Sequence, residues 1–211
     1  IGNNTLFLIT NTAAANSPNR VKDAAAIDMY GGTYAFHNDG GNGVFTETNG
    51  ALRLQYGAST ISSMQAAATA TNRLVFASVL RPLKLSLAPN GATINFAGAG
   101  LGVNSRNLVR FSSAPDLSST YGIMPYGTVN GTNWAAYDTV LGSVAGFSDY
   151  IGSNETTWVL GPGDAKSNVL IRSGPITLSA ARTVNSLNLT LTSNATIRLC
   201  CGKPSDSPKS T

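Results

Sequence analysis

The chain has 211 residues, of which 42% are hydrophobic and only 11% are charged, and its formal net charge is +4. This composition excludes a disordered chain, which is rich in charge and poor in aliphatic residues, and a helical bundle, since glutamate occurs only twice. No apolar run reaches the roughly 18 residues of a membrane-spanning helix, and the 14 basic residues form no cluster typical of nucleic-acid binding.

Short segments with β-strand character recur along the whole chain, either as alternating apolar and polar residues or as short apolar runs. In chain order they are residues 5–10, 52–56, 74–76, 83–87, 94–96, 169–171, 187–191 and 197–199. Residues 21–29 and 64–70 would permit helices, but both stretches are short and lack apolar residues at helical spacing. The sequence therefore predicts an all-β protein.

Turn signals separate these segments, because Gly and Asn tolerate the positive φ of sharp turns. The signals are Gly31-Gly32, Gly40-Gly41, Asn49-Gly50, Asn90-Gly91, Asn130-Gly131 and Ser193-Asn194. Small residues and tight turns suit a solenoid of stacked coils, and residues 49–61, 90–96 and 185–197 are faintly similar to one another. A parallel β-helix is therefore the expected fold. A β-sandwich is the alternative, although it would normally contain more than 8% aromatic residues.

The two cysteines, Cys200 and Cys201, are adjacent. Neighbouring residues of a strand point to opposite faces, so these two thiols are badly placed to share a metal ion. Two unrelated thiols are the simplest interpretation, and a strained vicinal disulfide and a disulfide between subunits are the alternatives. We expect no metal and no cofactor.

No set of residues forms a convincing catalytic site. His37 is the only histidine, and strand alternation places it on the face opposite Tyr34 and Phe36. Most of the ten acidic residues lie beside turn residues, where a carboxylate commonly caps its own backbone. Asp138 and Asp149 could meet on stacked coils and supply the two carboxylates of glycoside hydrolysis. We nevertheless predict no enzymatic activity and no catalytic residue.

Aromatic residues are concentrated between residues 121 and 150. They are Tyr121, Tyr126, Trp134, Tyr137, Phe147 and Tyr150. Such a cluster could stack on sugars, or it could belong to a loop that folds over the solenoid with its rings packed inward. Trp134 and Tyr137 are the candidate surface contacts for a carbohydrate.

Several blocks of sequence occur in an order that resembles the autotransporter-associated β-strand repeat. They are residues 19–27 (NRVKDAAAI), 31–36 (GGTYAF), 46–52 (TETNGAL), 57–61 (GASTI), 90–96 (NGATINF), 100–102 (GLG), 126–137 (YGTVNGTNWAAY), 168–171 (NVLI) and 182–189 (RTVNSLNL). The resemblance covers residues 17–199. It implies a right-handed parallel β-helix and a location outside the cell or on the bacterial surface, and it transfers no catalytic residue.

The predicted organisation is one β-helical domain over residues 1–199, with repeat-like units at residues 17–75, 76–150 and 151–199. Residues 200–211 are expected to form a flexible tail, because its Pro, Ser and Lys residues cannot continue a ladder of strands.

Both ends of the predicted solenoid resemble cut faces of a longer stack. The first strand carries the apolar run Thr5, Leu6, Phe7, Leu8 and Ile9, and no amphipathic cap precedes it. These residues are candidate subunit contacts, together with Cys200 and Cys201 at the other end. The sequence thus predicts a structural or adhesive surface protein that self-associates head to tail or contacts other surface proteins. A carbohydrate-binding or carbohydrate-cleaving β-helix is the alternative, and a nucleic-acid partner is not expected.

Overall fold

The computed structural model describes residues 1–39, 41–65, 69–81, 91–152, 159–160, 167–172, 176–178, 182–190 and 197–199. Within these residues the protein is all-β, which confirms the predicted class, and the one helical element is the short 3-10 turn η1 (Ser118–Thr120). Packing divides the chain into two compact units, unit 1 (Ile1–Phe147) and unit 2 (Ser148–Thr211). The expected continuity of a single domain through residue 199 stays a prediction.

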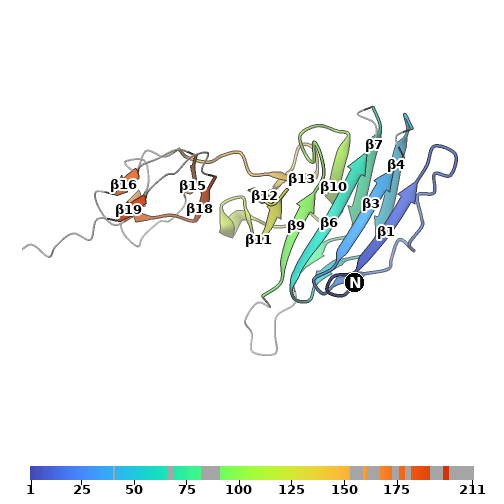
Figure 1. Ribbon diagram of the computed structural model, residues 1–211, viewed down its shortest axis with the longest axis horizontal. Coiled ribbons are helices and arrows are strands. Elements are labelled where there is room, and N and C mark those ends of the chain that lie inside the picture. Colours follow the sequence, from blue (N-terminus) through green and yellow to red (C-terminus); the bar gives the residue numbers. More distant parts are fainter. Residues whose placement is uncertain are drawn as a thin grey trace, which may run out of the picture. The chain divides into compact units, whose positions relative to one another are not determined.

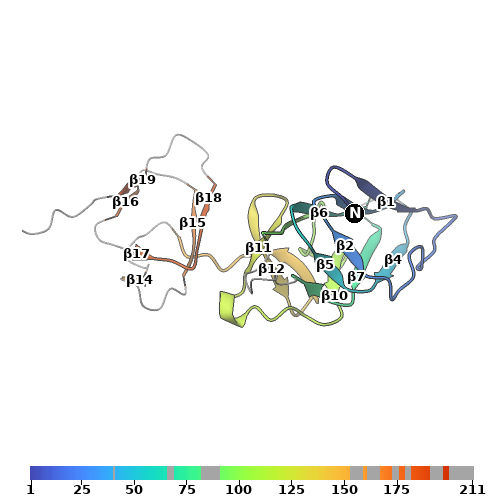
Figure 2. The ribbon, with the colours of Figure 1, turned by 90° about the horizontal axis from the view of Figure 1, so that it is seen from below.

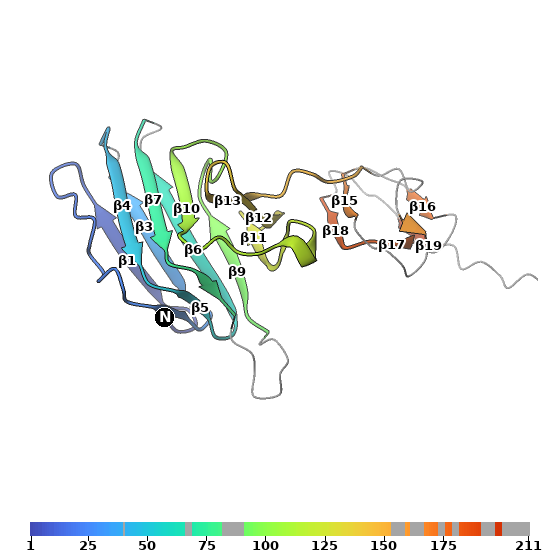
Figure 3. The ribbon, with the colours of Figure 1, turned by 180° about the vertical axis from the view of Figure 1, so that it is seen from behind.

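The described residues of unit 1 form three sheets, and strands of the largest lie side by side in Figure 1. Sheet 1 contains, in spatial order, β1 (Leu6–Asn11), β3 (Thr33–Asn38), β6 (Ala58–Gln65), β9 (Thr93–Ala97), β11 (Met124–Val129), β12 (Asn133–Asp138) and β13 (Ser143–Gly146). Sheet 2 contains β4 (Val44–Asn49), β7 (Thr71–Phe76) and β10 (Asn107–Phe111), which lie side by side in Figure 3. Sheet 3 contains β2 (Ile27–Met29), β5 (Leu52–Leu54) and β8 (Val79–Leu80).

Strands of successive turns of the chain pair in parallel and in register. Leu6 pairs with Thr33 and Thr33 pairs with Thr60, so that partners are 27 residues apart in sheet 1. The same spacing joins Val44 to Thr71 in sheet 2. Between β3 and β9 the chain therefore places one strand in each sheet before it returns to sheet 1, and Figure 2 shows strands of the three sheets from below.

The last strands of sheet 1 depart from this pattern. β12 pairs antiparallel with β11, and β13 pairs antiparallel with β12. Asn130 and Gly131 form the turn between β11 and β12, and both have positive φ (51° and 67°), as their turn signal predicts. Residues 126–137, which supply one block of the family resemblance, thus fold mostly as a hairpin rather than as a parallel coil.

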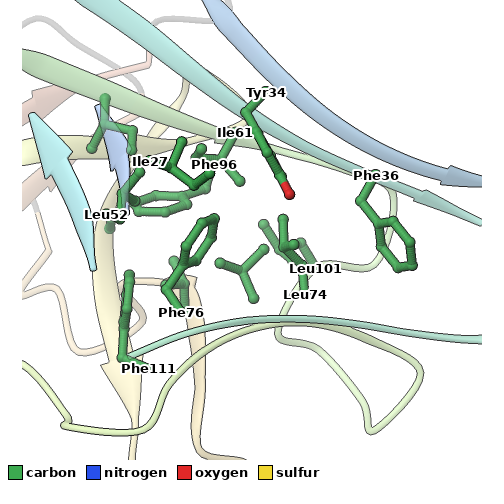
Figure 4. Packing of buried hydrophobic residues seen from close by; sticks show 14 of the residues in the cluster. Ile27, Tyr34, Phe36, Leu52, Ile61, Leu74, Phe76, Phe96, Leu101 and Phe111 are labelled. Carbon is green, nitrogen blue, oxygen red and sulfur yellow. The ribbon is translucent and has the colours of Figure 1, made fainter. Parts of the chain in front are cut away.

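Inward-facing side chains fill the space between the three sheets. In sheet 1 they stack in a row through the parallel register, as Phe7, Tyr34, Ile61 and Phe96 do. Figure 4 shows Tyr34, Phe76, Phe96 and Phe111 among the side chains that converge in this core. The ring centroids of Tyr34 and Phe76 lie 5.9 Å apart, within the range of favourable aromatic pairs. The core of unit 1 is therefore strongly aromatic although the chain as a whole is not.

Buried asparagines occur where the chain leaves sheet 1 or enters sheet 2. They are Asn11, Asn38, Asn72 and Asn107. Asn107 Nδ2 donates to the carbonyl oxygens of Ser63 and Ala99, both at 2.9 Å, and its Oδ1 accepts from the Ser63 hydroxyl at 2.6 Å. Asn72 Nδ2 likewise donates to the Met64 carbonyl at 2.7 Å. These amides satisfy backbone groups at corners where no strand supplies a partner.

Glu47 also binds backbone groups outside the strands, in a segment that precedes it in the chain. It lies on the inward face of β4, fully buried, at a register position that Leu74 occupies in the next coil. Its carboxylate accepts the backbone N–H of Arg20 at 3.1 Å and that of Val21 at 2.7 Å. The side chain thus fixes the segment around Arg20, which belongs to no strand, against sheet 2.

Burial raises the pKa of Glu47 above its ordinary value of 4.5, and the hydrogen bonds from Val21 and Arg20 only partly oppose this shift. Since the folded state then binds more protons than the unfolded state, the contribution of Glu47 to stability is fully present below pH 4.5 and is lost as pH rises through the folded-state pKa. We expect the difference in the free energy of unfolding, wild type minus Glu47→Gln, to fall as pH rises through the range above about 4.5. Urea denaturation of both proteins across this range measures the difference, and an increase with pH would contradict the assignment.

The described residues of unit 2 also form strands. They are β14 (Val159–Leu160), β15 (Asn168–Ile171), β16 (Ile176–Leu178), β17 (Arg182–Thr183), β18 (Ser186–Leu189) and β19 (Ile197–Leu199). β15 pairs in parallel with β18, β16 in parallel with β19, and β14 antiparallel with β17. Val169 and Ile171 form its buried centre. The predicted strand at residues 83–87 lies outside the described residues.

Candidate functional site

The first strand of sheet 1 has an exposed apolar surface. Leu6 is 64% exposed, Phe7 43% and Leu8 46%, whereas Ile9 is buried. Phe7 belongs to the inward row and stacks on Tyr34, with ring centroids 5.6 Å apart. One face of the Phe7 ring is therefore covered by the next coil, and no described strand covers the other face.

The backbone of β1 is also open along one edge. The carbonyl oxygens of Thr5 and Asn11 accept hydrogen bonds from the strand on the inner side, β3, and from the residue that follows it. Since successive residues of a strand direct their backbone groups to opposite sides, those of Leu6, Leu8 and Thr10 point to the free edge. Within the described residues no strand pairs with this edge, so it offers hydrogen-bonding groups beside apolar side chains.

A second uncovered apolar row lies on β18 of unit 2. Leu187 and Leu189 pair in register with Val169 and Ile171, which are completely buried or nearly so. Both leucines are themselves exposed. The alternation of residues 187–191 predicts an apolar row on this strand. It does not predict that the row is exposed, because this depends on the pairing with β15, which is distant in the sequence. The other predicted contacts, Cys200 and Cys201, lie outside the described residues.

A groove of about 440 Å³ crosses the outer face of sheet 1 over β6, β9, β11 and β12. Its lining residues are Ala58, Ser59, Thr60, Thr93, Ile94, Asn95, Pro125, Tyr126, Thr128 and Trp134. Tyr126 and Trp134 bring aromatic surface to it, and the threonines and Asn95 bring hydroxyl and amide groups. None of the ten residues is acidic or basic, so the groove offers apolar surface and neutral hydrogen-bonding groups.

Internal contacts hold three of the lining side chains in place. Asn95 Oδ1 accepts from the Thr128 hydroxyl at 3.1 Å and from the Gly131 N–H at 2.8 Å. The guanidinium of Arg81 lies over the Tyr126 ring, 5.2 Å from its centroid. Burial raises the pKa of Tyr126 above its ordinary value of 10.0, and the nearby Arg81 guanidinium partly opposes this shift.

The two candidate aromatic contacts have different surroundings. Trp134 lines the groove, whereas the ring of Tyr137 packs against Phe111 with centroids 5.9 Å apart. The Tyr137 hydroxyl donates to carbonyl oxygens of Phe111 and Gly142 and accepts the Phe111 N–H. Tyr137 thus contributes to packing in unit 1, and Trp134 contributes to a surface that a ligand could reach.

The structure gives local roles to the residues considered for catalysis. His37 Nε2 lies 3.1 Å from the Ser62 hydroxyl, and burial lowers the pKa of the imidazole. The Asp138 carboxylate accepts the N–H groups of Val140 and Leu141 at 2.8 and 3.0 Å, which is the turn-capping role expected of the acids. Asp149 accepts from the Ser148 hydroxyl in unit 2.

Comparison with known proteins finds no matching family model, no matching curated protein and no matching solved structure. In the described parts of the chain, no helix has the length and apolar character needed to cross a membrane. The same residues contain no group of three or more His, Cys, Asp or Glu side chains that could hold a metal ion. The features of the molecule that bear on function are therefore the open edge of β1, the apolar row on β18 and the groove on sheet 1.

Proposed function

We propose that this chain is a segment of a right-handed parallel β-helix. Each of the three sheets in unit 1 contains strands paired in parallel and in register, which supports this proposal, since the sheets of a β-sandwich are usually antiparallel. The return of the chain to the same sheet after 27 residues corresponds to one coil. The right hand follows from the strong preference for right-handed connections between parallel strands.

The proposed function is structural and adhesive, in a protein that is displayed on the bacterial surface or released from it and that stacks head to tail. The exposed Phe7 side chain and the open backbone edge of β1 carry this proposal. If β18 of one copy paired in parallel with β1 of the next, Leu187 would lie against Phe7 and Leu189 against Ile9. Such a contact would bury Phe7, Leu187 and Leu189. It would also join two different surfaces, so that it would propagate as a filament. The location rests on the family resemblance of residues 17–199.

The test is a pair of substitutions that place charge on the open edge. We expect the wild type to form concentration-dependent oligomers and Leu6→Lys/Leu8→Lys to stay monomeric, because lysines on an edge strand oppose strand addition. Sedimentation velocity over a range of concentrations measures the size, and negative-stain microscopy identifies filaments.

The matched control is Val103→Lys/Val140→Lys, which replaces two exposed apolar residues in turns outside β1. This variant should assemble like the wild type. A wild type that is monomeric at high concentration, or a β1 variant that assembles normally, would contradict the proposal.

A further inference from the structure

The groove on sheet 1 is lined by a row of side chains that crosses four strands. Thr60 pairs with Asn95, Asn95 pairs with Thr128, and Thr128 pairs with Trp134. Neighbouring strands lie about 4.8 Å apart, so three polar side chains and one indole follow one another along a line perpendicular to the strands. A linear ligand made of similar units would meet them in sequence.

An irregularity in β11 shapes one wall of this groove. The register between β11 and β12 shifts between Met124 and Thr128, and the lining residues Pro125 and Tyr126 lie inside this bulge. Gly127 permits the close approach of β12, because a Cβ at this position would lie only 3.2 Å from that of Ala135. β-Bulges commonly re-aim side chains beside functional sites, and here the bulge lies where Tyr126 and Trp134 both face the groove.

Several polar groups in the groove are available to a ligand. Asn95 uses its side-chain oxygen for internal hydrogen bonds, and its amide nitrogen donates to no group in the described part of the chain. The hydroxyls of Thr60 and Thr93 likewise bond to no described residue. A purely apolar ligand would leave these groups without partners, at a cost. An anionic ligand would find no cation among the lining residues.

We propose that the groove binds a neutral oligosaccharide. A sugar ring offers C–H groups on its faces, which suit Tyr126 and Trp134, and hydroxyls at its edge, which suit Asn95 and Thr60. The volume of about 440 Å³ lies within the range of pockets that hold small ligands. This site is separate from the open edge of β1 and does not depend on self-association.

The experiment uses an array of neutral tri- and tetrasaccharides of glucose, galactose, mannose and N-acetylglucosamine, printed beside sulfated and uronate-containing oligosaccharides. Both the wild type and Leu6→Lys/Leu8→Lys are applied, so that binding is measured in the absence of assembly as well. We expect neutral oligosaccharides to be bound by both proteins. The strongest neutral ligand is then titrated by calorimetry.

Two substitutions locate the binding. Trp134→Ala should weaken the affinity at least about tenfold, and Thr60→Val, which removes one hydroxyl at constant volume, about threefold. The controls are Tyr121→Ala, at an exposed tyrosine outside the groove, and Thr33→Val, which lies next to Thr60 in the same row but does not line the groove. Both controls should bind like the wild type.

Three results would overturn the proposal. One is that no neutral oligosaccharide binds at about 1 mM, the weak end of the affinities considered. Another is that only sulfated or uronate-containing oligosaccharides bind. The third is that Thr60→Val binds the oligosaccharide as tightly as the wild type. This variant tests the site even if Trp134→Ala does not fold.

Discussion

Phe76→Ala is expected to lower the free energy of unfolding by about 3–5 kcal/mol, because it leaves a cavity that the surrounding strands cannot fill. Phe76 is completely buried in β7, the central strand of sheet 2. Its ring lies against those of Tyr34 and Phe111, with centroid distances of 5.9 and 6.2 Å. The substitution therefore removes contacts to a side chain of sheet 1 and to the neighbouring strand at once.

Urea denaturation followed by circular dichroism measures the effect of Phe76→Ala. Val140→Ala is the control, because Val140 is 93% exposed and its truncation should change the free energy of unfolding by less than about 0.5 kcal/mol. A loss below about 1 kcal/mol for Phe76→Ala would mean that the three sheets do not enclose a common core.

Asn107→Leu should cost about 2–4 kcal/mol, because the new side chain is similar in size but can form none of the hydrogen bonds of the amide. The substitution leaves three groups without their partner, namely the carbonyl oxygens of Ser63 and Ala99 and the Ser63 hydroxyl. All of these bonds lie in the interior or at its margin, where water is a poor substitute.

The matched control for Asn107→Leu is Asn104→Leu in the preceding turn. Asn104 is exposed, and its side chain accepts one hydrogen bond, from the Arg106 N–H at 2.9 Å. The same unfolding measurement should give a loss below about 1 kcal/mol for this control. Equal losses for the two variants would show that burial of the Asn107 amide is unimportant.

Some strands of unit 1, among them β5 and β9, follow closely from local sequence. Leu52 and Leu54 alternate with Arg53 because one face of β5 is buried and the other is not. The same argument holds for Ile94 and Phe96 in β9. Alternation of apolar and polar residues indicates that one face of a strand is buried, and this pattern is visible within a few consecutive residues.

The buried polar groups could not be predicted in the same way. Asn107 meets Ser63 across 44 residues, and Glu47 meets Val21 across 26. Their roles depend on the register between coils, which local patterns do not contain. The antiparallel end of sheet 1 had a local signal, Asn130-Gly131, but the family resemblance of the same residues favoured a parallel coil.

The groove contains one residue that the sequence singles out and several that only the register between strands brings together. Trp134 stands out in the sequence because aromatic residues are rare in this chain. Thr60, Asn95 and Thr128 do not stand out, since Thr and Asn are common throughout, and they share a row only because three strands pair in a particular register. Tyr137 shows the converse, since a conspicuous aromatic residue near Trp134 belongs to the packing of unit 1.

The number of residues that separate paired strands of sheet 1 differs from one pair to the next. Thr33 pairs with Thr60, but Thr60 pairs with Asn95 after a longer connection. The entropy of closing a loop grows slowly with its length, by about 0.6 kcal/mol per doubling. The corners between sheets can therefore accept insertions at little thermodynamic cost. New surface loops could arise there during evolution, or be grafted there by design, without any change to the side chains of the interior.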